Sequence, residues 1–194
     1  MTILVTGATS GFGKAIAIIF AKNGYDVIIT GRRKEKLEVV KAELEKFGKD
    51  VLALNFDVRN NEEVKTAVGN LRGKWETIDV LVNNAGLAVG LSSIQEGTIE
   101  DWDRMIDTNI KGLLYITRAI SPIMIARKQG HIINIGSVAG KEVYANGNVY
   151  CATKHAVDAL NKAMRIDMLP HNIRVTVICP GLAETEFALV RFKG

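Results

Sequence analysis

The amino-acid sequence predicts an α/β protein built on a doubly wound parallel β-sheet with helices on both faces. Short runs of β-branched and apolar residues alternate with longer stretches of helical periodicity along the whole chain. Six of the short runs are almost continuously apolar, which is typical of parallel strands that helices cover on both sides. We therefore expect the order β-α-β-α to continue to the last strand.

The elements follow one another with short connections. In the first half the expected strands are 2–6, 26–30 and 51–55, and the expected helices are 13–23 and 33–47.

In the second half, Asn60 with Glu63 predicts the capped start of a helix, and Thr98 with Asp101 forms a weaker capping pair. The expected helices are 61–72, 102–126 and 149–168, and the expected strands are 78–84, 131–136 and 173–179.

Length and composition indicate one domain over residues 1–194. The chain is 47% hydrophobic, and a chain of 194 residues can bury roughly 70% of its unfolded surface. We find no internal repeat, low-complexity tract or proline-rich linker.

The net charge of +4 does not indicate a nucleic-acid-binding protein. Lysine and arginine alternate with glutamate along residues 32–49, which predicts a solvated helix face with the i,i+4 pairs Lys34–Glu38 and Lys41–Glu45.

The two cysteines, Cys151 and Cys179, are too few for a disulfide framework or a zinc site, so we expect no metal centre. The sequence opens without a basic leader and has no apolar run of eighteen residues, so we expect a cytoplasmic protein outside the membrane.

The segment T-G-A-T-S-G-F-G, residues 6–13, lies between the first strand and the first helix. Backbone amides and the helix N-terminus at such a turn favour an anion. Its spacing, G-x-x-x-G-x-G, departs from the ordinary dinucleotide fingerprint, and a plain glycine-rich turn is the alternative. The candidate cofactor-binding residues here are Gly7, Thr9, Ser10, Gly11, Phe12 and Gly13.

Arg32 and Arg33 follow the second strand, where an NAD-selective site carries an acidic residue. A guanidinium group suits a 2′-phosphate in charge and in N–H geometry, so we expect NADP(H) as the cofactor. Two exposed arginines at the start of a charged helix are the alternative.

Two further strand ends carry candidate cofactor contacts. Asp57 and Val58 follow the third strand, where an adenine ring would lie, and N-N-A-G follows the fourth with Asn84, Ala85 and Gly86. Asn, Asp and Gly also favour turns for purely structural reasons.

Tyr150 and Lys154 are four residues apart in an expected helix, so their side chains lie roughly 5–6 Å apart on one face. An ammonium group nearby stabilises a phenolate and would lower the pKa of Tyr150. Such a tyrosine can exchange a proton with an alcohol or carbonyl while hydride is transferred. The same spacing also occurs by chance on surface helices.

Two polar residues accompany this pair. Ser137 follows the fifth strand and could bind the reacting oxygen, although a serine there is commonly a turn residue. Asn109 lies inside the long expected helix, where it has no propensity advantage, and could mark a polar kink or hold water.

Together these motifs, in their order and spacing, resemble the short-chain dehydrogenase/reductase family over the whole chain. The resemblance implies a Rossmann-like fold and a catalytic set in which Tyr150 is the general acid/base. Lys154 would lower the pKa of Tyr150 and hold the nicotinamide ribose, Ser137 would bind substrate oxygen, and Asn109 would support a water relay.

The C-terminal segment resembles the family's P-G-x-x-x-T motif. By that likeness Pro180, Gly181 and Thr185 would contact the nicotinamide carboxamide. T-G-R-R, G-N-V-Y and T-E-F with V-R-F-K-G resemble the NADP-dependent 3-hydroxy acid dehydrogenases, which act on serine, allo-threonine and related compounds. Arg191 would then bind the substrate carboxylate, with an exposed loop arginine as the alternative.

Two other functions remain open from the sequence. The same machinery could reduce a ketone or a 3-oxoacyl group, and a non-catalytic NADP(H) sensor could use the same glycine loop. A sensor would not require Ser137, Tyr150 and Lys154 together.

Family members continue beyond the point where this sequence ends, so we expect the C-terminal closing segment to be missing here. Residues 149–168 show an alanine stripe and a second apolar sector, which is more than one core contact needs. We therefore expect a homo-oligomer, a dimer or a tetramer.

Overall fold

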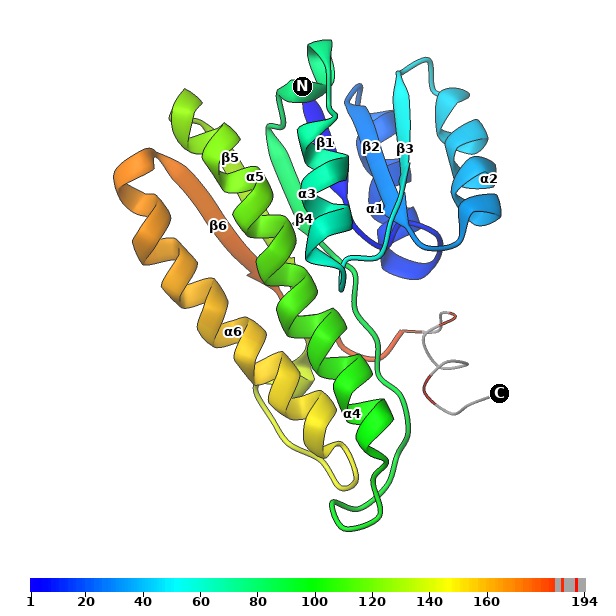
Figure 1. Cartoon of the computed structure of the whole chain (residues 1–194), viewed down its shortest axis with the longest axis vertical. Coiled ribbons are helices and arrows are strands. Elements are labelled where there is room, and N and C mark those ends of the chain that lie inside the picture. Colours follow the sequence, from blue (N-terminus) through cyan, green and yellow to red (C-terminus); the bar gives the residue numbers. More distant parts are fainter. Residues whose placement is uncertain (184–185, 187–190, 192–194) are drawn as a thin grey trace.

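The computed structural model describes residues 1–183, Glu186 and Arg191, and it contains a six-stranded sheet with helices on both faces (Figure 1). The predicted fold class is confirmed. The strands are β1 Thr2–Val5, β2 Asp26–Gly31, β3 Val51–Asn55, β4 Val80–Asn83, β5 Gly130–Ile135 and β6 Ile173–Ile178. The α-helices are α1 Gly11–Lys22, α2 Lys34–Glu45, α3 Asn61–Gly69, α4 Ile99–Ile106, α5 Leu113–Arg127 and α6 Asn148–Met168.

The strand order is β3-β2-β1-β4-β5-β6, and every neighbouring pair is parallel. The chain therefore winds outward in one direction from β1 and in the other from β4. In such sheets ligands bind outside the carboxyl ends of the strands at this reversal point. The turns after β1 and β4 consequently meet where a cofactor is expected.

Alternating strand residues fill two separate cores, as a sheet covered on both faces requires. Leu4, Ile28 and Ile132 pack with apolar residues of α3, α5 and α6. Ile3 and Val27 point to the opposite face and pack with residues of α1 and α2. In Figure 1 the helices α3, α5 and α6 lie in front of the sheet, and α1 lies behind it.

Buried amides link the sheet to the helices of the first core. Asn83 Nδ2 on β4 donates to Thr117 Oγ1 on α5 and to Asn134 Oδ1 on β5, each at 2.9 Å. Asn134 Nδ2 then donates to Asn161 Oδ1 on α6 at 3.0 Å. Buried amides need hydrogen-bond partners, so this series of hydrogen bonds fixes the position of α6 against β5.

The helix predicted over 102–126 is present, but it is not one continuous α-helix. The structure has α4, a π-helical segment Asp107–Gly112 and α5, because six residues with wider hydrogen bonding interrupt the α-helix. Thr98 is the N-cap of α4, but its side chain makes no capping hydrogen bond.

The other local expectations are confirmed in part. Asn60 caps α3 by accepting the N–H groups of Glu62 and Glu63, although the helix ends at Gly69 rather than at residue 72. Among the described ion pairs of α2, Lys41–Glu45 is present at 3.8 Å and Lys34–Glu38 is absent. In the described part of the chain no helix is both long and apolar enough to cross a membrane.

Candidate active site

The glycine loop after β1 packs directly on the N-N-A-G turn after β4. Gly7 has φ +65°, and a Cβ there would lie 2.9 Å from Ala85 Cα. A Cβ on Gly13 would lie 2.4 Å from both Gly7 O and Asn84 Nδ2. These positions exclude any larger residue, so the two turns can approach only with glycine in place.

Thr6 joins the two turns, and sequence reasoning missed its role. Its Oγ1 accepts the backbone N–H groups of Asn84 at 3.0 Å and Ala85 at 2.9 Å, while Asn84 Nδ2 donates to Thr6 O at 2.8 Å. The available signal was a threonine at the end of an apolar strand, just before the first glycine. Thr6 is buried, which makes it a structural clamp under the loop.

Helix α1 begins at Gly11 at the floor of this crevice, with Ser10 as its N-cap. The Ser10 side chain makes no capping hydrogen bond, and the first turn carries no acidic residue. Its first N–H groups are therefore suited to an anion, since a helix N-terminus is partly positive. Phe12 lies at the rim with 40% of its surface exposed.

The two arginines after β2 point to different partners. Arg33 Nη2 donates to Thr9 Oγ1 at 2.7 Å and to Ser10 Oγ at 3.0 Å, so it stands beside the glycine loop. Arg32 Nη1 lies 3.6 Å from Asp57 Oδ2. The structure thus brings Arg33 to the glycine loop and pairs Arg32 with Asp57 after β3.

Asp57 is held by Arg59, which sequence reasoning did not single out. Arg59 Nη2 donates to Asp57 Oδ2 at 2.6 Å, and Arg59 N donates to Oδ1 at 3.0 Å. Burial acts to raise the pKa of Asp57, but the Arg59 hydrogen bonds and the Arg32 charge outweigh it and lower that pKa. Val58 is buried against Gly112 rather than open to the crevice.

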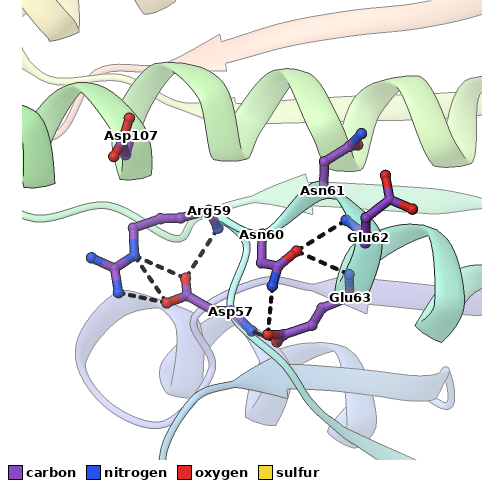
Figure 2. Close-up of a pocket in the computed structure, with 7 residues that line it drawn as sticks. All are labelled: Asp57, Arg59, Asn60, Asn61, Glu62, Glu63 and Asp107. Carbon is purple, nitrogen blue, oxygen red and sulfur yellow. Dashed lines mark hydrogen bonds and ion pairs between the residues drawn. The ribbon is translucent and has the colours of Figure 1, made fainter.

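An open hollow of about 480 Å³ lies beside this ion pair (Figure 2). Most of its polar groups serve the fold: Asn60 caps α3, Glu63 accepts the N–H of Asp57, and Asp57 binds Arg59. We assign it no catalytic part, because it shares no lining residue with the tyrosine site. Its lining residues are Asp57, Arg59, Asn60, Asn61, Glu62, Glu63 and Asp107.

Ser137, Tyr150 and Lys154 converge at the carboxyl end of β5. The Ser137 hydroxyl hydrogen-bonds with the Tyr150 phenol, and Lys154 Nζ lies 5.9 Å from the centre of the Tyr150 ring. Lys154 Nζ also donates to Ile135 O at 2.9 Å. A Cβ on Gly86 would lie 3.7 Å from Lys154 Nζ, so this group borders the turn that packs on the glycine loop.

Burial shifts both ionisable groups toward their neutral forms. It lowers the pKa of Lys154 to about 8. It also raises the pKa of Tyr150, against the opposing effects of the Ser137 hydrogen bond and the Arg191 charge. The sequence predicts a lowered pKa for Tyr150, and this direction is wrong for the chain by itself because desolvation is the larger effect.

Asn109 lies in the π-helical segment and is fully committed to protein partners. Its Oδ1 accepts from Leu87 N at 2.8 Å, and its Nδ2 donates to Leu87 O at 2.8 Å and to Thr153 Oγ1 at 3.0 Å. It therefore ties the segment after β4 to α6, one residue before Lys154. The sequence left a polar kink or a water-holding site open for Asn109, and the structure shows a buried amide that hydrogen-bonds across the fold from a π-helical segment.

Arg191 lies over the catalytic tyrosine candidate and is held by a second tyrosine. Its Nη2 donates to Tyr144 Oη at 2.7 Å, and its guanidinium carbon lies 5.2 Å from the Tyr144 ring and 5.4 Å from the Tyr150 ring. Sequence reasoning missed Tyr144. The sequence offered only its aromatic character and its place six residues before Tyr150 as a signal.

The segment after β6 runs beside the Ser137 turn. Val138 N donates to Pro180 O at 3.1 Å, and Gly181 has open space around it. Thr185 lies outside the described residues. Across the residues that the structure describes, no group of three or more His, Cys, Asp or Glu side chains could hold a metal ion.

The chain is similar to known proteins along its whole length. The family model described as short chain dehydrogenase matches residues 1–193. The NADP-dependent 3-hydroxy acid dehydrogenase YdfG of Salmonella typhi is 53% identical over 195 residues, which span all of this chain and 77% of that protein. Serine 3-dehydrogenase of Rhizobium radiobacter is 47% identical, over 100% of this chain and 76% of that protein.

A solved structure described as the closed form of serine dehydrogenase complexed with NADP+ superposes with a TM-score of 0.96. It is 50% identical and covers 100% of this chain and 77% of its own.

Proposed function

The chain belongs to the short-chain dehydrogenase family, and from this premise we propose that it is an NADP-dependent dehydrogenase of small 3-hydroxy acids. The observation that carries the proposal is the convergence of Ser137, Tyr150 and Lys154 beside the glycine loop. The relatives that match over the whole chain are named for this cofactor and for hydroxy acid or serine substrates. The activity is that of an oxidoreductase acting on a CH–OH group.

The residues of the crevice fit NADP. The uncapped N-terminus of α1 suits the pyrophosphate, and glycine at positions 7 and 13 leaves the backbone open beside it. Arg33 presents its guanidinium group at the Thr9 and Ser10 hydroxyls, where a 2′-phosphate would find N–H and O–H donors. When bound, the nicotinamide accepts or donates the hydride.

Tyr150 is the proposed general acid/base. In the oxidation direction its oxygen takes the proton of the substrate hydroxyl, and in the reduction direction the same oxygen returns it. Ser137, already hydrogen-bonded to that phenol, orients the reacting oxygen. Asn109 keeps α6 and the segment after β4 in position, and its part in a water relay stays a proposal.

Lys154 has two proposed roles. Its ammonium group stabilises the phenolate that forms when Tyr150 gives up its proton, which matters because burial alone opposes that charge. From its place beside the Gly86 turn it would also hold the nicotinamide ribose by donating a hydrogen bond. Below pH 8 the group keeps the proton that both roles need.

Arg191 supports the choice of an acidic substrate. Its guanidinium group lies 5.4 Å from the Tyr150 ring, so a carboxylate bound to it stands next to the proton-transferring phenol. Tyr144 fixes the guanidinium plane through its hydroxyl and its ring. A bidentate contact of this kind selects acids over neutral alcohols.

A screen of NADP reduction tests the proposal. Serine, allo-threonine, 3-hydroxyisobutyrate and 3-hydroxypropionate are compared with simple secondary alcohols and, in reverse, with ketones and 3-oxoacyl compounds. We expect turnover of the acids above that of matched neutral alcohols, and Arg191→Met to raise KM for the acids only. Equal turnover of neutral alcohols would contradict the substrate class, and cofactor binding without any turnover would favour the sensor.

The assembly proposed is a homo-oligomer in the cytoplasm. On α6 the residues Ala152, Ala159 and Ala163 are exposed, Ile166 exposes 73% of its surface, and Leu169, directly after the helix, exposes 77%. An exposed helix face of small and apolar residues suits close packing against a second copy.

A further inference from the structure

Glu186 holds two cations at the start of α2. Its Oε2 lies 2.9 Å from Arg33 Nη1, and its Oε1 lies 2.8 Å from Lys36 Nζ. The hydrogen bonds from Lys36 and Arg33 lower the pKa of Glu186 to about 2. The carboxylate is therefore ionised throughout the neutral range, and each of its oxygens accepts from a different cation.

The same Arg33 reaches the glycine loop with its other terminal nitrogen. Nη2 donates to Thr9 Oγ1 and Ser10 Oγ, while Nη1 donates to Glu186 Oε2. Arg32 stands apart, because its guanidinium group faces Asp57. The cationic group at the end of β2 consequently consists of Arg33 and Lys36, with two hydroxyls, rather than of the two adjacent arginines.

This group has the chemistry of a phosphate site. Two cations, Arg33 and Lys36, hold a carboxylate here, and Arg33 also reaches two hydroxyls of the glycine loop. Phosphate oxygens accept the same charge-assisted hydrogen bonds as a carboxylate. Lys36 lies in the first turn of α2, whose N-cap residue, Arg33, makes no side-chain capping bond. The partly positive helix end therefore adds to the attraction for an anion.

We propose that Lys36 is a determinant of NADP specificity, and that the Glu186 carboxylate competes with the 2′-phosphate for Arg33 and Lys36. The inference rests on the proposed function, since it presupposes NADP. A phosphate that approaches Arg33 and Lys36 meets donors already engaged by Glu186, so it must displace or share them. An internal competitor lowers the apparent affinity for NADP(H) but leaves NAD(H), which lacks that phosphate, unaffected.

Titrations of NADPH and NADH by cofactor fluorescence test both halves of the proposal at fixed ionic strength. We expect Glu186→Gln to tighten NADPH binding by about two- to fivefold, the range for a partly exposed ion pair, with NADH binding unchanged. We expect Lys36→Met to weaken NADPH binding by about tenfold, since it removes one charged hydrogen bond, again with NADH unchanged. In the double variant the gain from Glu186→Gln should shrink.

The matched controls are Lys34→Met and Glu35→Gln, which remove the same charges from exposed positions in the same turn of α2. If Lys34→Met and Lys36→Met weaken NADPH binding equally, Lys36 contributes only its charge at long range, and its proposed role in specificity is overturned. If Glu186→Gln binds NADPH as tightly as the wild type or more weakly, the proposed competition between Glu186 and the 2′-phosphate is overturned. A wild-type protein without preference for NADPH over NADH would instead overturn the cofactor assignment itself.

Discussion

At the scale of single residues, burial and function oppose each other in the tyrosine site. Desolvation makes the neutral phenol of Tyr150 and the neutral amine of Lys154 easier to form, whereas the proposed reaction needs a phenolate and an ammonium in turn. Placing the two groups within one helical turn allows each charge to offset the cost of the other. The phenolate and the ammonium therefore stabilise each other in a site where burial disfavours either charge alone.

Replacing Tyr150 with phenylalanine tests the proton-transfer role. The ring and its packing remain, while the only hydroxyl proposed to carry the substrate proton is lost, so kcat should fall by about 10²–10⁴-fold. NADPH affinity, measured by fluorescence titration, should stay within a factor of about two, because no charge is removed. Tyr25→Phe, which removes a hydroxyl on the other side of the sheet, serves as the control. Retained activity in Tyr150→Phe would eliminate this residue as the acid/base.

The low pKa of Lys154 predicts a pH dependence of cofactor binding. In the proposed role a protonated Lys154 would donate toward the nicotinamide ribose, and in the free protein it loses that proton near pH 8 rather than near 10.5. The dissociation constant for NADPH should therefore be flat between pH 7 and 7.5 and should rise as the pH passes through 8. The measurement is a titration series from pH 7 to 9.5. The same rise in Lys154→Met would show that another group is responsible.

At the scale of elements, the sequence located every strand and most helices, because continuous apolar runs and helical periodicity report directly on burial. It missed the π-helical segment at residues 107–112, since one polar residue in a helix, Asn109, does not reveal that its amide binds Leu87 across a loop. Tyr144, Thr6 and Glu186 were missed for the same reason. Each acts through a partner far away in the sequence, and periodicity carries no information about such pairs.

Asp79 connects several elements at the amino ends of the strands. Its carboxylate accepts the N–H of Thr2 at the start of β1 at 2.8 Å and the guanidinium group of Arg127 at the end of α5 at 2.7 Å. Burial works against the charge, yet these two hydrogen bonds lower the pKa of Asp79 below its usual 3.8. The ionised carboxylate therefore stabilises the folded chain.

Asp79→Asn should destabilise the protein at pH 7 by about 1–3 kcal/mol, because the Arg127 charge loses its partner. Since the folded-state pKa lies below 3.8, the stabilisation is present above pH 3.8 and is lost as the pH falls through the folded-state value. Urea unfolding of both proteins across pH 3 to 7 should show the difference shrinking only at the acid end. Asp103→Asn, at an exposed position on α4, should change little. A difference that stays constant down to pH 3 would refute this account.

At the scale of the whole molecule, the strand order places chemistry from distant parts of the sequence at one edge. The turns after β1, β2 and β4 form the proposed cofactor side, Ser137 after β5 and the residues of α6 form the proposed catalytic side, and Lys154 Nζ borders the Gly86 turn where they meet. The sequence predicted this meeting from topology, because all parallel strands end at the same edge. Which arginine faces which partner depended on side-chain geometry that topology does not determine.

The proposed oligomer would form through the exposed face of α6 that carries Ala152, Ala159 and Ala163. A charged residue among the exposed alanines would be buried unpaired on association, so Ala159→Glu should shift the sedimentation coefficient from an oligomer toward the monomer. Val39→Glu provides the matched control: it places the same charge on an exposed apolar position of α2, on the opposite face of the sheet, and should leave assembly unchanged. An Ala159→Glu protein with wild-type sedimentation would assign association to another surface. If association also supports α6, Ala159→Glu should lower kcat as well, because Tyr150 and Lys154 lie on that helix.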